Sequence, residues 1–153
     1  MNSAGFDSNI LAYLAGVRRD PKDDAQIVRA RLVLDKLAEE VRLVAPVQAL
    51  GETFVVLRRH GAALADAAQR IAGLTASFQL APSISSTLES ALTFASEHRL
   101  QFWDSLIIAA SLEAGCRLLL SEDMQDGFTV GGLTVVNPLL DKPHRALVRL
   151  LEA

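Results

Sequence analysis

The chain has 153 residues, of which half are hydrophobic and 22% are charged, so the composition predicts a folded domain with its own core and excludes a disordered chain. The formal net charge of −3 and the aromatic content of 5% argue against a protein that coats nucleic acid through a basic stripe or stacks bases on an aromatic platform. There is no run of about 18 uncharged apolar residues, and the opening MNSAGFDSN lacks the features of a signal peptide, so we expect a cytoplasmic protein without a membrane segment.

Short apolar runs alternate with longer stretches that have helical spacing. In chain order, the predicted elements are a strand at 2–6, a helix at 9–15, a charged loop at 18–24, a helix at 25–41, a strand at 42–46, helices at 47–59 and 62–78, a strand at 79–83, helices at 85–99 and 103–115, and strands at 117–121 and 133–138. This alternation predicts an α/β fold in which helices cover both faces of a parallel sheet. We expect one domain over residues 1–153, because no repeat or second domain is visible.

Two helices carry specific local signals. The helix at 103–115 is predicted to bury an apolar stripe made of Trp103, Leu106, Ile107, Ala110 and Ala114. Asp104 lies beside that stripe, and Gly115 is predicted to end the helix. The helix at 85–99 opens with a capping signature, in which Ser86 is followed three residues later by Glu89.

The cysteine and histidine content argues against a zinc site. Cys116 is the only cysteine, and its place between a helix and an apolar strand predicts a buried thiol. His60, His98 and His144 show no ligand spacing, and we expect them to face solvent or to serve structure. The chain also lacks the GxSxG, GxGxxG and P-loop motifs.

Four acids follow or flank the predicted strands, namely Asp7, Glu52, Asp104 and Asp123. Taken singly, three of them have ordinary explanations, as a helix cap, a partner of a helix dipole or a turn residue. Glu52 is harder to explain in this way, because apolar residues surround it in the sequence. Ligands of open parallel sheets bind beyond the carboxyl ends of the strands, so four acids at that edge predict one shared site.

Acids that converge need a counter-charge. Two carboxylates about 4 Å apart repel each other by roughly 4 kcal/mol at an effective dielectric constant of 20. Protonation or a bound cation relieves that repulsion. Oxygen ligands without cysteine or paired histidines favour Mg²⁺, for which Mn²⁺ can substitute, over zinc. Neutralising the four acids changes the formal net charge from −3 to +1, which removes the general repulsion of a polyanionic substrate.

Four blocks, in this order and spacing, resemble the PIN-domain ribonucleases, and most closely the VapC-type toxins of bacterial toxin–antitoxin pairs. They are FDSNILAYL, ALGETFVVL, FWDSLIIAA and LLLSEDMQDG, and the similarity extends to LTVVNP. The resemblance implies a three-layer α/β/α sandwich with a central parallel sheet and a Mg²⁺-dependent endoribonuclease site. The family's catalytic, metal-binding acids correspond to Asp7, Glu52, Asp104 and Asp123.

The resemblance also indicates polar residues that orient the acids or a water. Ser8 and Asn9 follow the first acid, and Ser121 precedes the last. Glu122, Asp123 and Asp126 share one short loop, in which Asp123 fits the family register best. Asp126 is then expected to contact the metal-binding acids without binding the metal itself.

The activity that the resemblance implies is metal-assisted hydrolysis of RNA phosphodiester bonds, with one or two cations. It also implies a VapB-like antitoxin that holds the enzyme inactive, and a homodimer. Two basic clusters are candidates for phosphate contacts, with a solvated surface as the alternative for both: Arg58, Arg59 and His60, and Lys142, His144 and Arg145.

Other classes of protein fit the sequence less well. A haloacid-dehalogenase-like phosphatase also begins with an acid after a strand, but it needs a second Asp two residues later, where this chain has Asn9. A phosphoacceptor receiver domain needs paired early acids and a late lysine, neither of which is visible. The remaining alternative is a PIN-like domain that binds RNA or protein without turnover, and acids in all four blocks argue against it.

Overall fold

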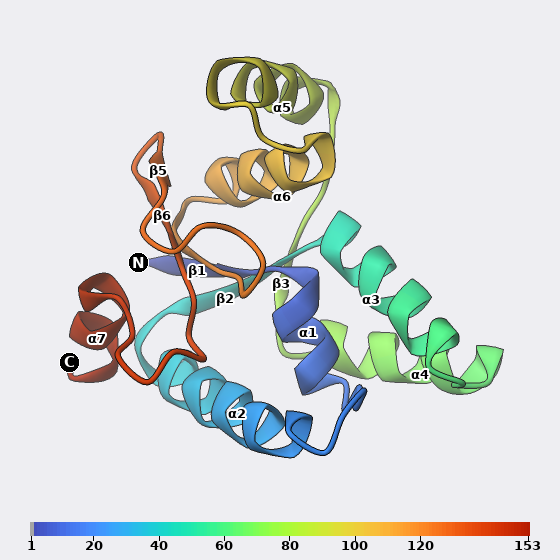
Figure 1. Cartoon of the computed structure of the whole chain (residues 1–153). Coiled ribbons are helices and arrows are strands. Elements are labelled where there is room, and N and C mark those ends of the chain that lie inside the picture. Colours follow the sequence, from blue (N-terminus) through green and yellow to red (C-terminus); the bar gives the residue numbers. More distant parts are fainter. Residues whose placement is uncertain (1) are drawn as a thin grey trace.

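A computed structural model describes residues 2–153 as a six-stranded sheet with helices on both faces (Figure 1). Its elements are β1 (Ser3–Phe6), α1 (Ser8–Leu14), α2 (Asp23–Glu40), β2 (Arg42–Pro46), α3 (Val47–Arg59), α4 (Leu64–Thr75), β3 (Gln79–Ala81), α5 (Ser85–His98), α6 (Phe102–Glu113), β4 (Cys116–Leu120), β5 (Thr129–Val130), β6 (Leu133–Val136) and α7 (Arg145–Leu151). The predicted α/β class, with a largely parallel sheet between layers of helices, is confirmed.

The strand order β3-β2-β1-β4-β6-β5 places β1 and β4 at the centre of the sheet. β1 pairs in parallel with both β2 and β4, and the parallel pairing continues outward to β3 and β6. β5 pairs antiparallel with β6. The chain builds the sheet in one direction from β1 and in the other from β4, so the order reverses between these two strands. Open α/β sheets bind their ligands beside such a reversal, beyond the carboxyl ends of the strands.

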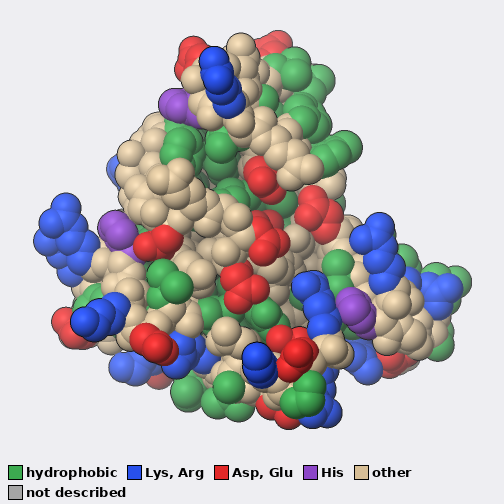
Figure 2. Space-filling view, in the orientation of Figure 1, with side chains coloured by type: hydrophobic (Ala, Val, Ile, Leu, Met, Phe, Trp, Pro, Cys, Tyr) green, Lys and Arg blue, Asp and Glu red, His purple; other side chains and the backbone are tan. Residues whose placement is uncertain are grey.

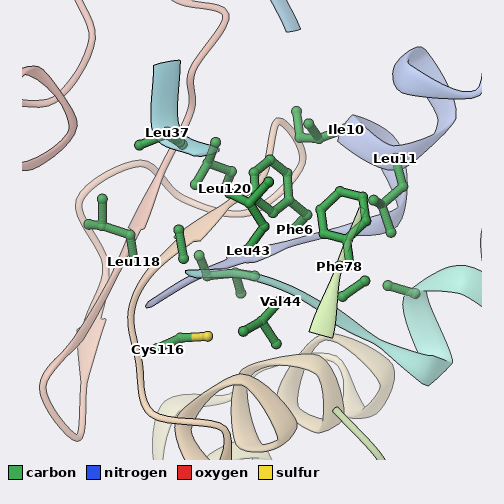
Figure 3. Close-up of a cluster of buried hydrophobic side chains, with 14 of the residues drawn as sticks. Phe6, Ile10, Leu11, Leu37, Leu43, Val44, Phe78, Cys116, Leu118 and Leu120 are labelled. Atoms are coloured by element: carbon green, nitrogen blue, oxygen red, sulfur yellow. The ribbon is translucent and has the colours of Figure 1, made fainter. Parts of the chain in front are cut away.

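The two faces of the sheet bury separate sets of side chains (Figure 3). Leu43 and Val44 are consecutive in β2 and point to opposite faces, as the period of a strand requires. Leu37 of α2 covers the face of Leu43, while Val44 lies on the side of α6 (Figure 3). The buried ring of Phe6 packs edge to face on Phe78, with ring centroids 5.2 Å apart.

α6 is the most enclosed helix, because it lies between the sheet and α5 (Figure 1). Every residue from Ser105 to Ser111 is buried, and both serine hydroxyls donate to carbonyl groups one turn earlier in the helix. β1 approaches α6 closely at Gly5, where an added Cβ would lie 2.8 Å from Ser111 Oγ. The helix ends as predicted, with Gly115 at a φ of +83°.

Two local predictions were wrong. Trp103 is 51% exposed, because it lies in the first turn of α6, before the helix enters the space between the sheet and α5. The predicted Ser86–Glu89 cap is not formed. Thr87 Oγ1 instead accepts a hydrogen bond from the Ile84 backbone N–H at 2.9 Å, and Ser86 donates to Glu113.

The sequence analysis did not predict β5 and α7. The short strand β5 turns into β6 through two glycines with positive φ, Gly131 and Gly132. α7 begins after His144, whose Nδ1 accepts from the Ala146 backbone N–H at 3.1 Å. Cys116 is buried as predicted, and burial raises the pKa of its thiol to about 12. Within residues 2–153, no helix has both the length and the apolar character needed to cross a membrane.

Candidate active site

The four predicted acids lie around the carboxyl end of the central strands. Asp7 directly follows β1, and Asp123 follows β4 with two residues between. Glu52 is in the second turn of α3, which leaves β2, and Asp104 is in the first turn of α6. Figure 2 shows acidic side chains gathered near the centre of this face, where α1, α3, α6 and the loop after β4 come together (Figure 1).

Asp7 is held by both of its neighbouring segments. Its side chain is buried, and Oδ1 accepts the Ser8 backbone N–H at 2.7 Å, which caps α1. Oδ2 accepts from the hydroxyl of Ser121 at 2.7 Å and from the amide of Asn9 at 3.2 Å. These contacts fix the carboxylate plane between β1 and β4, so the predicted orienting roles of Ser8, Asn9 and Ser121 agree with the geometry.

Burial raises the pKa of Asp7 to about 6. The hydrogen bonds from Ser121 and Ser8 stabilise the charged form and lower the pKa, while the negative charges of Asp104 and Glu52 raise it further. The pKa of Asp7 therefore depends on the charges of two of the other predicted acids.

Glu52 is connected to Asp7 through a single serine. The Ser8 hydroxyl donates to Glu52 Oε2 at 2.9 Å, while the Ser8 backbone N–H binds Asp7. The other oxygen of Glu52 accepts from the Gln48 side chain at 3.2 Å. Ser8 thus positions two carboxylates that are 45 residues apart in the sequence.

Asp104 and Asp123 are the other two members of the group of four predicted acids. Partial burial raises the pKa of Asp104, and the charges of Glu52 and Asp123 raise it further. Asp123 itself is exposed. The charge of Asp104 acts in turn on Asp7. The four acids therefore form one electrostatically connected group, although they come from four segments of the chain.

The three acids of the loop after β4 have different contacts. Glu122 accepts from the hydroxyl of Tyr13 at 3.1 Å. Asp126 accepts from the Asn137 backbone N–H at 2.7 Å, so it fastens the far end of the loop to the end of β6. Asp123 acts on Asp104 through its charge. This division favours Asp123 as the fourth acid and gives Asp126 a structural contact away from the other three acids.

Sequence reasoning missed two residues of this site, Gln48 and Tyr13. Each lies on the same helical face as a residue that was singled out, four positions from Glu52 and from Asn9, respectively. A search for polar side chains one turn away from each candidate residue would have found both.

The donor set fits a hard divalent cation. The four acids offer carboxylate oxygens, while Ser8, Asn9 and Ser121 are engaged in hydrogen bonds that hold the acids and the loop after β4. Within residues 2–153, no three Asp, Glu, His or Cys side chains are already drawn together as a closed set of ligands. An open arrangement suits Mg²⁺, which keeps several waters and uses one or two protein carboxylates together with substrate phosphates. It suits structural zinc less well, because that ion needs four close ligands.

A cavity of about 320 Å³ adjoins Glu52 along α3, and Gln48, Gly51, Val55, Val56 and Arg59 line the rest of it.

Each of the two basic clusters has one side chain in a local structural contact. Arg58 of the first cluster donates to the Ala62 carbonyl, and His144 of the second caps α7. A larger cavity of about 460 Å³ lies beyond the other end of α1. It contains none of the four acids, and its arginines already form ion pairs with aspartates.

The chain matches the PIN domain family over residues 6–126. No curated protein matches it in sequence. Solved structures share its fold at low identity. A toxin–antitoxin complex from Klebsiella pneumoniae has 21% identity and a TM-score of 0.64, with 88% of this chain and 97% of that chain covered.

Two further structures are similar to the chain. VapC20 of Mycobacterium tuberculosis, a toxin that cleaves the sarcin–ricin loop, has 18% identity and a TM-score of 0.60, with 78% of this chain and 89% of that chain covered. VapBC2 from Rickettsia felis, bound to a DNA fragment of its promoter, has 11% identity and a TM-score of 0.65, with 88% and 98% covered.

Proposed function

Because the chain belongs to the PIN domain family, which matches it over residues 6–126, we propose that it is a divalent-metal-dependent endoribonuclease that hydrolyses RNA phosphodiester bonds. The observation that carries the proposal is the electrostatic coupling of four acids at the carboxyl edge of the sheet, with Asp7 buried among them. Holding such charges together costs folding free energy, and a cation that binds them offsets that cost.

The proposed ligands of the cation are Asp7, Glu52, Asp104 and Asp123. A bound Mg²⁺ or Mn²⁺ supplies Lewis-acid stabilisation for the negative charge that develops on a phosphate during hydrolysis. The chain's own polar residues fix the ligands beforehand. Ser8 holds Asp7 and Glu52, while Ser121 and Asn9 hold the second oxygen of Asp7. Such outer contacts set the orientation of metal ligands and are typically worth about 10- to 100-fold in metal affinity or activity.

Substrate RNA would reach the acids from the open face. Asp123 and Arg59 are exposed, and the cavity beside Glu52 extends along α3 toward Arg59. We propose that Arg59 contacts a phosphate next to the one that is cut. Such a contact would contribute mainly to binding and would weaken with salt.

We further propose that the chain is the toxin of a toxin–antitoxin pair, active on cytoplasmic RNA, inhibited by a VapB-like antitoxin and assembled as a homodimer. The support is the fold shared with a toxin–antitoxin complex and with VapC20. Ile84, which caps α5, is exposed together with Leu88 and Leu92 on that helix. Their spacing of four residues gives one face of the helix an apolar surface that an antitoxin or a second copy of the chain could contact.

The nuclease proposal is tested with protein that has been purified under denaturing conditions, refolded and thereby freed of any antitoxin. Wild type should cut a mixed pool of structured RNA with Mg²⁺ or Mn²⁺, and EDTA should stop the cleavage. Asp7→Asn and Asp104→Asn each remove one charged ligand and should slow cleavage by more than about 100-fold, beyond the usual loss from outer contacts. Asp35→Asn, on the exposed side of α2, removes the same charge away from the site and should cut like wild type.

Two results would change the conclusion. Equal cleavage by wild type and Asp104→Asn would mean that the activity comes from another site or from a contaminant. Metal binding by wild type without cleavage of any RNA in the pool would favour a PIN-like binding domain without turnover.

A further inference from the structure

The loop after β4 presents adjacent acids, Glu122 and Asp123, to one site. Either carboxylate is a chemically suitable ligand for a cation. Residues 122–124 form a bend after the strand, so the hydrogen bonds that anchor this loop decide which of the two carboxylates faces Asp104.

One face of α1 provides that anchoring. The Asn9 Oδ1 accepts the Glu122 backbone N–H at 2.9 Å, and the hydroxyl of Tyr13 donates to Glu122 Oε1 at 3.1 Å. Asn9 and Tyr13 are four residues apart and therefore lie on the same side of the helix. Residue 122 is thus held through both its backbone and its side chain.

The side chain of Ser121 holds the turn at residues 121–124. The Ser121 hydroxyl donates to Asp7 at 2.7 Å and accepts the Met124 backbone N–H at 3.2 Å. Asp123 is consequently the part of this turn that is left exposed, between two anchored residues. The hydroxyl of Tyr13 holds the carboxylate of Glu122, so the exposed carboxylate of this turn is that of Asp123.

We propose that Tyr13 is a positioning residue, whose hydroxyl holds Glu122 against α1 so that Asp123, and not Glu122, faces Asp104. This inference rests on the proposed metal-dependent function, because it concerns which acid joins the metal site. The ring of Tyr13 packs against the main hydrophobic core. Replacement by phenylalanine therefore removes the hydroxyl and keeps the packing.

The test compares five single variants by Mn²⁺ affinity, measured from the electron paramagnetic resonance signal of free Mn²⁺, and by RNA cleavage, with Asp123→Asn as the reference for the loss of a ligand. Tyr13→Phe and Glu122→Ala both remove the contact and should weaken Mn²⁺ binding by about 10-fold or more. Glu122→Gln keeps an oxygen that accepts the tyrosine hydroxyl and should retain most of the wild-type affinity. Asp35→Asn is the control, since it removes a charge from the exposed side of α2, outside the site, and should bind Mn²⁺ like wild type.

Two further measurements separate positioning from general stability. The double variant Tyr13→Phe/Glu122→Ala should bind Mn²⁺ no more weakly than either single variant, because both changes break one contact. Amide hydrogen exchange at Glu122 and Met124 should accelerate in Tyr13→Phe without metal or RNA, while exchange in β1 and β4 stays at the wild-type rate.

The proposal is overturned if Glu122→Gln loses Mn²⁺ binding as completely as Asp123→Asn, because Glu122 would then be a ligand itself. It is also overturned if Tyr13→Phe matches wild type in affinity, cleavage and exchange. If wild type itself neither binds Mn²⁺ nor cuts RNA, the proposed function fails and the positioning role fails with it. If wild type does both and the variants match it, only the positioning role fails.

Discussion

Asp7 combines nearly complete burial with a position among other acids. At 3% exposure its carboxylate has lost most of its hydration, and the hydrogen bonds from Ser8, Asn9 and Ser121 replace only part of it. Folding therefore favours the protonated form, whereas metal binding requires the charged form. The same side chain thus destabilises the metal-free protein and is already positioned to bind a cation.

The folded pKa of Asp7, about 6, lies above its ordinary value of 3.8, so its favourable contribution to stability is fully present below pH 3.8 and is lost as the pH rises through 6. At 1.36 kcal/mol per pKa unit, the loss is on the order of 3 kcal/mol. We therefore expect Asp7→Asn to gain stability relative to wild type between pH 4 and pH 8 in EDTA. Urea unfolding at several pH values measures this difference, and parallel curves for the two proteins would contradict it.

β1 and α6 carry two of the acids at their ends, and their mutual packing sets the distance between these acids. Gly5 makes this close packing possible, because a Cβ there would lie 2.8 Å from Ser111 Oγ of α6. Asp7 follows β1, two residues after Gly5, while Asp104 is in the first turn of the helix that Gly5 contacts. A shift of α6 away from β1 would therefore move Asp104 relative to Asp7.

Gly5→Ala should destabilise the fold by about 1–3 kcal/mol, because the added methyl group overpacks the contact with Ser111. Ser111→Ala removes the oxygen that lies 2.8 Å away, so the double variant Gly5→Ala/Ser111→Ala should recover part of the loss. Chemical denaturation of the four proteins in this cycle measures the coupling. Strictly additive effects would show that another contact limits the approach.

The acid group belongs to the molecule as a whole, since it draws on β1, α3, α6 and the loop after β4. A ligand that binds this group only in the folded state stabilises all of these segments together. Mass action gives about 2.7 kcal/mol of stabilisation when the free ligand is at 100 times its dissociation constant.

We expect Mg²⁺ or Mn²⁺ to raise the Tm at pH 8, and to raise it less at pH 5, where protonated Asp7 competes with the cation. Differential scanning calorimetry with metal, compared with NaCl at matched ionic strength, measures the effect. Asp104→Asn should reduce the shift. An unchanged Tm across millimolar metal in wild type would contradict a metal site formed by the folded chain.

The sequence predicted the fold best where apolar residues recur at a regular spacing along the chain. The apolar runs of β1, β2 and β4 and the helical spacing of α3 and α6 predicted the sheet and its covering helices. Trp103 shows the limit of this reasoning, because periodicity identifies a helical face but not how far the neighbouring layer extends along it. β5 was missed because two residues are too few to show a period, and its pairing depends on the turn through Gly131 and Gly132.

The sequence analysis named the four acids and three of the polar residues that contact them, Ser8, Asn9 and Ser121, but it missed Gln48 and Tyr13. Strand ends and the family resemblance indicated Asp7, Glu52, Asp104 and Asp123, and the structure couples their charges. That they bind metal is a prediction. Tyr13 and Gln48 act through contacts that depend on side-chain rotamers and on where a distant loop lies. The spacing of Gln48 and Tyr13 from Glu52 and Asn9 is visible in the sequence, but these contacts are not.

The reversal of strand order between β1 and β4 has a consequence for synthesis of the protein. Asp7 emerges from the ribosome well before β4, its neighbour in the sheet, which is more than 100 residues later. At roughly 5–20 residues per second, several seconds of translation separate the two strands. The nascent chain can form local helices in that interval, but it cannot assemble the four acids. We infer that the group of four acids assembles only once Asp123 has left the exit tunnel.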